Sequence, residues 1–184
     1  DAHKLVRYHI FGTQSKSQGM LILPKKGLNV LKSLAVGEEA VTMRFNQSHA
    51  FFKILDTELI CRLIDQKYPD YNAVIPVNNN NILRIEKSVL LHSLKRTAIY
   101  ANKSTNQVRL GLSADALTIY SQDLNFSNEA EEALPCEYEG EALQISFNAK
   151  FLVEMLAVMD GENIVFKLDS PARAGVLLPD QQDE

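Results

Sequence analysis

Histidine and cysteine are the side chains of this sequence that could support metal binding or nucleophilic catalysis. His3 and His9 stand six positions apart, so they would share one face of an extended strand. No third ligand accompanies them at a spacing typical of a metal site. Cys61 and Cys136 lie 75 residues apart and form no CxxC pair, which argues against a zinc ribbon or a disulfide scaffold. We expect two small buried thiols in a reducing compartment and neither a metal nor a cofactor.

Nucleophilic catalysis would need a second group beside the thiol. Cys61 follows Ile60 and precedes Leu63 by two positions, which indicates a packed strand, and His49 and His92 stand alone on predicted elements. The sequence contains no GxGxxG, GxxxxGK[ST], HExxH or GxSxG motif. We assign no catalytic residue. A small hydrolase that uses Cys61 or a histidine stays open as one alternative, although no partner residues converge on either.

Three amphipathic helices at a constant spacing organise the chain. Apolar periodicity predicts them over residues 24–36, 86–102 and 148–160, so their starts are 62 residues apart both times. Pro24 suits a first helical turn and Asn148 is a favourable N-cap. Gly37 and Gly161 follow two of the helices as stop signals. The regular spacing indicates an internal repeat.

Alternating strands surround each helix. Residues 19–23, 81–85 and 142–147 are predicted strands before the helices, and residues 1–11 form a further strand without its helix. The strands predicted after the helices span 40–46, 49–56, 57–64, 107–113, 116–123, 129–140, 163–169 and 173–179. The repeating unit is therefore β-α-β-β-β, and the fold class is α+β with helices on one face and antiparallel sheets on the other. The turn-rich segment 76–81 separates two predicted domains, 1–78 and 79–184.

Composition and charge narrow the function classes. The chain has 184 residues, of which 46% are hydrophobic and 23% charged, and this is ordinary for a folded domain. The net charge of −4 gives no overall sign of nucleic-acid binding, but the first helix carries three lysines and no acid, whereas acids concentrate at 129–141. These runs indicate solvated faces or a basic helical surface that could follow phosphates. No apolar run is long enough for a membrane span and the first residues lack a signal-peptide pattern, so we expect a cytoplasmic location and no membrane contact.

Several stretches carry a family resemblance. Residues 1–5 read DAHKL, 61–76 read CRLIDQKYPDYNAVIP, 95–99 read KRTAI, 129–132 read EAEE, and 147–148 read FN. In this order they resemble the β subunit of bacterial DNA polymerase III, the sliding clamp. Its pattern includes T-D-[GA]-H-[RK]-L, R-L-I-[DE]-G-x-[FY]-P-D-Y-x-x-V-[IL]-P and K-R-x-A-I. Gln66 replaces the usual glycine. The resemblance implies the later part of a middle clamp domain, followed by a third domain that lacks its last strand.

The resemblance also implies a function and three sets of residues. It implies a non-catalytic processivity factor that closes around duplex DNA of any sequence as a ring homodimer. Its partners would be the polymerase III catalytic subunit, the clamp loader, and other polymerases and repair proteins that carry clamp-binding peptides. The positions expected to face DNA are Lys25, Lys26, Lys67 and Arg96. The positions expected in the peptide-binding cleft are His3, Leu5, Pro69, Val74, Pro171 and Arg173. The positions expected at the dimer edge are Ile99, Tyr100, Glu129 and Glu131. A clamp-like peptide-binding module that never encircles DNA remains the main alternative.

Overall fold

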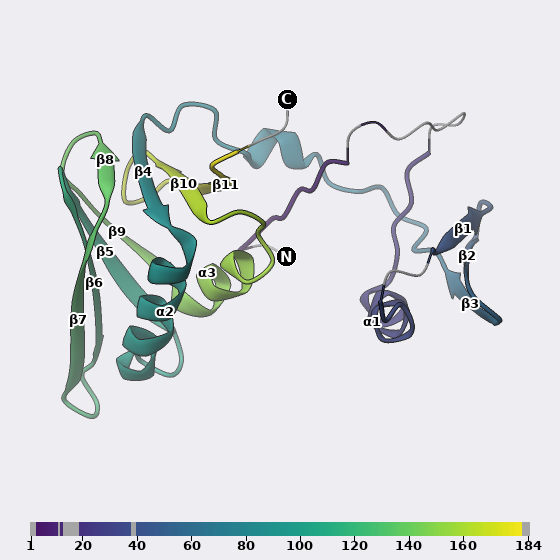
Figure 1. Ribbon diagram of the computed structural model, residues 1–184, viewed down its shortest axis with the longest axis horizontal. Helices are drawn as coiled ribbons and strands as arrows, with labels where there is room; N and C mark the ends of the chain where they lie inside the picture. The colour runs from purple at the N-terminus through teal and green to yellow at the C-terminus, as the bar shows by residue number, and fades with distance from the viewer. Residues whose placement is uncertain (1–2, 11, 13–18, 38–39, 182–184) are drawn as a thin grey trace. The chain divides into compact units, whose positions relative to one another are not determined.

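The computed structural model describes residues 3–10, 12, 19–37 and 40–181 (Figure 1). The chain divides into two compact units. We call His9–Asp70 the N-terminal unit, and Asp1–Tyr8 together with Tyr71–Glu184 the C-terminal unit. The boundary between these compact units lies between residues 70 and 71. The domain boundary between residues 78 and 79, expected from the sequence, stays a prediction. Within the described ranges, no helix has both the length and the hydropathy to cross a bilayer.

The N-terminal unit contains one helix and one antiparallel sheet of order β1-β2-β3. Its elements are α1 (Lys25–Leu34), β1 (Thr42–Phe45), β2 (His49–Ile54) and β3 (Thr57–Arg62). A small core joins buried Phe52 and Cys61 to Leu31 of the helix. Gly27 faces the Cys61 Sγ atom so closely that a Cβ atom at residue 27 would overlap the sulfur. The absence of a side chain at Gly27 therefore lets α1 approach β3.

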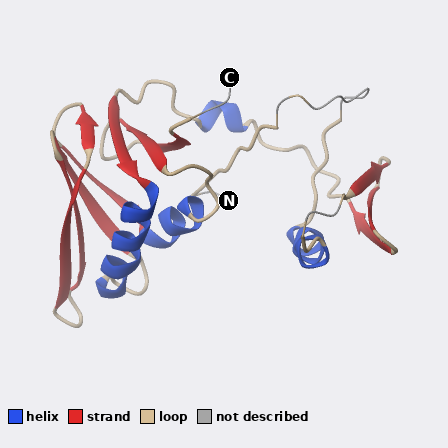
Figure 2. Ribbon diagram, in the orientation of Figure 1, coloured by secondary structure: helices blue, strands red, loops and turns tan. Residues whose placement is uncertain are grey.

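The C-terminal unit contains two four-stranded antiparallel sheets, β11-β10-β4-β8 and β7-β6-β5-β9, and two helices (Figures 1 and 2). Its helical elements are η1 (Tyr71–Val74), α2 (Lys87–Thr97), η2 (Ala98–Tyr100) and α3 (Ala149–Leu156). Its strands are β4 (Asn81–Glu86), β5 (Gln107–Ser113), β6 (Ala116–Asp123), β7 (Asn128–Pro135), β8 (Glu137–Glu139), β9 (Leu143–Asn148), β10 (Asn163–Leu168) and β11 (Val176–Pro179). Both sheets and both helices contribute to one apolar core, which includes Leu83, Leu94, Leu110, Leu156 and Phe166.

The two repeats of the C-terminal unit exchange strands. β5 of the first repeat pairs with β9 of the second, and β10 of the second pairs with β4 of the first. The registers correspond, because Gln107 lies opposite Asn148 in one pair and Asn163 lies opposite Glu86 in the other. The helices α2 and α3 pack against each other. Each sheet therefore contains strands from both repeats, two from each in β11-β10-β4-β8 and β9 alone from the second repeat in β7-β6-β5-β9.

The predicted helices and the α+β class are confirmed. The helices begin at Lys25, Lys87 and Ala149, each one residue later than predicted, so the 62-residue spacing holds. Asn148 caps α3 as expected, since its Oδ1 atom accepts a hydrogen bond of 3.0 Å from the Lys150 N–H. The second helix is shorter than predicted, because it passes into the 3-10 turn Ala98–Tyr100.

Three predicted strands are wrong. The described part of the 1–11 strand, residues 3–10, forms no strand. Lys4 instead pairs with Glu154 of α3 and lies 4.8 Å from the centre of the Phe151 ring, so helix contacts replace a sheet partner. Residues 19–23 also form no strand, because the structure describes a single backbone hydrogen bond there, from Ile64 N–H to the Ile22 carbonyl at 2.9 Å.

The third correction concerns the strand predicted over 129–140. It breaks at Cys136 into β7 and β8, which belong to different sheets. Pro135 ends β7, because proline has no N–H to donate to a further ladder hydrogen bond. The chain therefore crosses from one sheet to the other within a single residue.

Candidate functional site

The predicted DNA-facing lysines belong to the N-terminal unit. Lys25 and Lys26 form the first turn of α1 and are exposed, and Lys67 is exposed in the segment after β3. No acid lies in that first turn and Pro24 offers no side-chain cap, so the helix N-terminus keeps its positive potential. Among the described contacts, none is an ion pair of these three lysines. Their ammonium groups are therefore available to phosphates.

Arg96, the fourth predicted DNA-facing residue, is engaged within the C-terminal unit. Its Nε and Nη2 atoms donate to the two oxygens of Glu132 at 2.8 and 2.6 Å. This hydrogen bonding raises the pKa of Arg96, and it holds the pKa of Glu132 below the usual carboxyl value. The Arg96 side chain is still 59% exposed. A phosphate at Arg96 would therefore compete with a carboxylate already bound there.

Five of the six predicted cleft residues lie in the C-terminal unit, and Pro69 lies in the N-terminal unit. His3 stacks on Phe151 of α3 with ring centres 6.0 Å apart, so the first described residues lie along that helix. Val74 ends the 3-10 turn η1 and is 68% exposed, and Leu5 is 38% exposed. Arg173 donates to Asp169 at 3.2 Å, and Pro171 is exposed in the turn between them.

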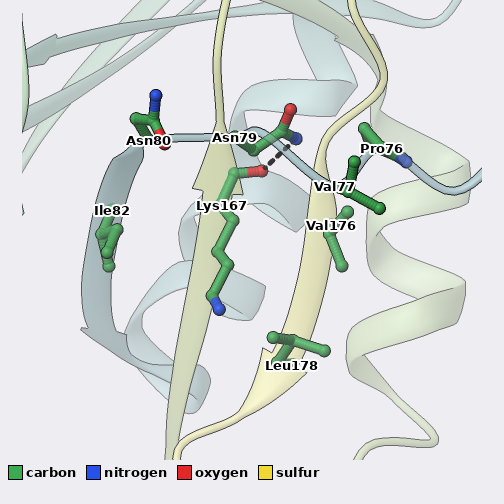
Figure 3. Close-up of a pocket in the computed structure, with 8 residues that line it drawn as sticks. All are labelled: Pro76, Val77, Asn79, Asn80, Ile82, Lys167, Val176 and Leu178. Carbon is green, nitrogen blue, oxygen red and sulfur yellow. Dashed lines mark hydrogen bonds between the residues drawn. The ribbon is translucent and has the colours of Figure 1, made fainter.

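A pocket of about 400 Å³ lies on the sheet β11-β10-β4-β8, and it contains none of the six predicted cleft residues (Figure 3). Its lining residues are Pro76, Val77, Asn79, Asn80, Ile82, Lys167, Val176 and Leu178. The sheet residues among them alternate with the core residues, so they lie on the face turned away from the core. Sequence reasoning missed this pocket, although the alternation in 163–168 was a usable signal.

The predicted dimer-edge residues are exposed. Ile99 and Tyr100 lie in η2 and are 65% and 44% exposed. Glu129 and Glu131 are exposed on β7, which is the end strand of its sheet in the described part of the chain. The Tyr120 hydroxyl donates to Glu129 at 3.2 Å. An end strand with free backbone groups can pair with another strand.

Metal and thiol chemistry find little support in the described residues. Nowhere in those ranges do three histidine, cysteine or acidic side chains gather as a metal site would require. Cys61 is buried against Gly27, and burial raises the pKa of the Cys136 thiol, which disfavours the reactive thiolate. The Ser48 hydroxyl and His49 Nδ1 lie 2.8 Å apart, but both residues belong to a turn whose N–H groups donate to Asn46 Oδ1.

Comparison with known proteins identifies the architecture. The family model for the DNA polymerase III beta subunit, C-terminal domain, matches residues 72–184. The beta sliding clamp of Pseudomonas aeruginosa is 30% identical over 186 residues, which cover 100% of this chain and 50% of that protein. The clamp of Synechococcus elongatus is 29% identical over 188 residues, which cover 97% of this chain and 49% of that protein.

Solved structures of sliding clamps also superpose on this chain. The DNA polymerase III subunit beta of P. aeruginosa superposes with a TM-score of 0.87 at 28% identity, over 92% of this chain and 47% of that one. Its griselimycin-bound form superposes with a TM-score of 0.85, over 94% of this chain and 47% of that one. The fold is that of the sliding clamps. The chain belongs to the DNA polymerase III beta subunit family, and it spans about half the length of the relatives it matches.

Proposed function

We propose that the chain is part of a DNA sliding clamp, a non-catalytic cytoplasmic processivity factor that closes around duplex DNA as a ring dimer. The observation that carries this proposal is the series of helices α1, α2 and α3 at constant spacing, in a chain of the DNA polymerase III beta subunit family. Helices repeated at a constant spacing, each followed by antiparallel strands, are suited to a ring, because each repeat adds one more helix.

The chemistry of Lys25, Lys26 and Lys67 supports sequence-independent DNA contact. Lysine ammonium groups bind phosphate oxygens without reading base edges, and they exchange readily with water and counterions. The net charge of −4 means that acids outnumber bases in the chain as a whole, and this excess repels a polyanion. Together these features favour a protein that stays on DNA by topology and slides along it, rather than one that binds a fixed site.

Partner proteins would bind through short peptides. Exposed Leu5 and Val74, with Pro69, His3, Pro171 and Arg173, would form the cleft that the family resemblance implies. Burying one large apolar side chain contributes about 2 kcal/mol, so two anchors give a moderate affinity after the cost of ordering the peptide. The polymerase III catalytic subunit, the clamp loader and other polymerases and repair proteins would share this site in turn.

Ring closure would use the edge formed by Ile99, Tyr100, Glu129 and Glu131. The two apolar side chains would lose water at the contact, and the acids would meet basic groups of the other subunit. Because this chain spans about half of its relatives, the ring is tested in a hybrid clamp, in which this chain replaces the aligned half of the P. aeruginosa protein.

The hybrid clamp is loaded on nicked circular DNA and followed by gel filtration. We expect it to remain on the circle for many minutes and to leave once the DNA is linearised, because a ring escapes only over an end. A folded, dimeric hybrid that shows the same half-life on circular and linear DNA would contradict the proposal. The Ile99→Asp hybrid is a control, since it should fail to stay on either DNA.

A second candidate function is a clamp-like peptide-binding module that does not encircle DNA. The ion pair between Arg96 and Glu132 favours it, because this pair occupies one of the four groups expected to face DNA. The hybrid that binds peptides normally but never shows topological retention on circular DNA would support this alternative.

A further inference from the structure

The apolar core of the N-terminal unit extends to an open edge of its sheet. β1 is an end strand of that sheet in the described part of the chain. Met43 and Phe45 of β1 lie opposite the buried Phe52 and Ala50 of β2, so they are on the core face, yet each is 47% exposed. The helix α1 buries none of its residues, whereas α2 and α3 each bury several. The core face of this sheet therefore extends past the side chains that cover it.

The C-terminal unit shows how such an edge is filled. There the first strand after each helix has two neighbours: β5 pairs with β6 and β9, and β10 pairs with β11 and β4. One neighbour is the next strand of the same repeat, and the other leads into the helix of the other repeat. Among the described residues, β1 has only the first kind of neighbour, β2. Its open edge corresponds to the one that β4 or β9 fills.

Residues 19–23 are the matching unpaired segment. They lead into α1 as β4 leads into α2, and Ile22 stands three positions before its helix, as Arg84 does. The Ile22 carbonyl accepts from the Ile64 N–H at 2.9 Å, on the side where Arg84 pairs with Glu137 of β8. The opposite edge of β4 pairs with β10, whereas the opposite edge of 19–23 has no described hydrogen bond. The unit thus holds both an open strand edge and a segment suited to fill one.

We propose that two copies of this chain associate by exchange, with residues 19–23 of each copy pairing with the open edge of β1 in the other. A twofold axis fills both vacancies at once, because each copy presents the same edge and the same segment. This exchanged dimer would bury Met43 and Phe45 of both copies and pair the exposed backbone groups of β1. The proposal goes beyond the proposed DNA and peptide functions and depends on neither.

The C-terminal unit also supplies the register of the exchange. In both of its exchanged pairs, the residue before a helix lies opposite the first residue of the strand that it joins. The same rule places Pro24 of one copy opposite Thr42 of the other, and Leu23 opposite Met43. The next pair on the core face, two positions further on, is again leucine against a large apolar residue, Phe45. Both core-face pairs are therefore apolar, as cross-strand neighbours in a core should be.

One residue of α1 opposes the association. Leu94 and Leu156 are buried where α2 and α3 pack together, and each is the eighth residue of its helix. The eighth residue of α1 is Lys32, which is exposed. If the two α1 helices meet as α2 and α3 do, the two Lys32 side chains lie near the twofold axis and repel each other. The exchanged dimer should therefore be weak at low salt and tighten as salt screens this repulsion.

Sedimentation equilibrium of the 184-residue chain, at several protein and salt concentrations, tests the association. We expect a monomer–dimer equilibrium that shifts toward the dimer as salt rises, and a dimer about tenfold tighter in Lys32→Leu. Met43→Asp should abolish the dimer, because a carboxylate would enter the apolar contact. Ile60→Asp is the matched control, since Ile60 is 57% exposed but lies on the other face of the sheet. Circular dichroism checks that each variant is folded.

A cysteine pair tests the register. Arg44 and Ile22 of different copies would lie opposite each other, at a Cα separation of about 4.5–5.5 Å that a disulfide can span. In a Cys136→Ser background, Arg44→Cys with Ile22→Cys should give a covalent dimer on a non-reducing gel when oxidised glutathione is the oxidant. Lys53→Cys with Ile22→Cys is the control, because Lys53 is exposed on β2, away from the open edge.

The contrary outcomes are distinct. A chain that stays monomeric at every salt concentration, also as Lys32→Leu, would overturn the proposal. A dimer that persists in Met43→Asp, or that crosslinks equally through the control cysteines, would overturn it by locating the interface elsewhere. A monomeric chain whose Met43→Asp change destabilises the hybrid clamp, but not the chain by itself, would assign the open edge to another repeat of the clamp and not to a second copy.

Discussion

Lys87 and Ala149 occupy equivalent positions in the two repeats of the C-terminal unit. Each is the first residue of its helix, and the two are 62 residues apart. The Lys87 N–H donates to the Glu162 carbonyl, and the Ala149 N–H donates to the Asn106 carbonyl, both at 2.8 Å. Each helix thus begins on a hydrogen bond to the other repeat. A donor that would otherwise be one of the unsatisfied groups of a helix end joins the two repeats instead.

Replacing Lys87 with proline tests this bond. Proline suits the first turn of a helix, and the preceding Glu86 is extended, with φ −62° and ψ 125°, as a residue before proline prefers. Lys87→Pro should therefore remove the N–H without breaking α2. The control Lys87→Ala removes the side-chain bond from Lys87 Nζ to the Met159 carbonyl but keeps the N–H. We expect the proline variant to be about 1–2 kcal/mol less stable than the alanine variant in urea unfolding. Equal stabilities would contradict this role.

The contact between Gly27 and Cys61 predicts a destabilising substitution with a specific rescue. Gly27→Ala places a Cβ atom against the Cys61 sulfur and should cost about 1–3 kcal/mol, although alanine is the better helix former. Cys61→Ala removes the sulfur, so it should cost less in the Gly27→Ala background than in the original chain. Thermal unfolding of the four proteins measures the coupling. Additive effects would show that the overlap relaxes elsewhere.

The ion pair between Arg96 and Glu132 predicts a pH dependence of stability. The hydrogen bond from Arg96 lowers the pKa of Glu132 below its ordinary value of 4.5. The resulting stabilisation is fully present above 4.5 and is lost as pH falls through the lower pKa of the folded state. Arg96→Met should therefore be less stable than the original chain at pH 7, and the difference should shrink at pH 3.

Urea unfolding at both pH values measures the Arg96 effect. Lys95→Met is the matched control, since Lys95 is the adjacent exposed cation and has no described ion pair. Its stability difference from the original chain should not follow the titration of Glu132. A difference for Arg96→Met that is the same at pH 7 and pH 3 would show that the pair does not stabilise the fold.

The lysines of α1 predict the salt dependence of DNA binding. Lys25→Ala with Lys26→Ala should weaken binding to duplexes of unrelated sequence to the same extent. It should also reduce the slope of log K against log salt by roughly 0.9 for each phosphate that a lysine no longer neutralises. Anisotropy titrations with labelled duplex at several salt concentrations measure both. Lys53→Ala, an exposed lysine on β2, is the control and should leave the slope unchanged. An unchanged slope in the double variant would remove α1 from the DNA-facing surface.

Val74 predicts the contribution of the cleft to peptide binding. Val74→Asp places a carboxylate where an apolar side chain of the partner would pack, so affinity for a Gln- and Leu-containing peptide should fall at least tenfold, or about 1.4 kcal/mol. Val158→Asp is the control, because Val158 is 67% exposed, as Val74 is 68% exposed, and lies just after α3. Circular dichroism checks the fold of both variants. Equal affinities of the two folded variants would exclude Val74 from the site.

Helix positions could be predicted because their signals are local. Asn148 caps α3 through its own side chain, and Pro24 precedes α1 without any help from distant residues. Alternation also predicted β5 and β6 to the residue, since it reports which face of a strand is buried. Alternation does not report which strand is the neighbour. The exchange of β4 and β9 between the repeats therefore had no signal in the alternation, whereas the break at Cys136 had one in Pro135.

For the candidate site, the exposure of single residues could be predicted, but contacts between distant segments could not. Exposure of Lys25, Lys26 and Glu129 followed from their residue types, and that of Ile99 from the family resemblance. The partner of Arg96 did not, because Glu132 belongs to a strand 36 residues further along the chain. The pocket around Lys167 was missed for a related reason, since its walls come from three separate segments that only the folded sheet brings together.

The exchange of strands between the repeats also governs how the C-terminal unit can fold. β4 finds its neighbour β10 only after most of the unit has been connected, and β9 must return to β5 across two intervening strands and the short β8. Such long sequence separations give a high contact order, which slows folding. Neither repeat forms a complete sheet from its own strands. We therefore expect neither repeat to be a stable folding intermediate without the other. The two repeats share one pattern of elements, but the C-terminal unit folds as a single cooperative unit.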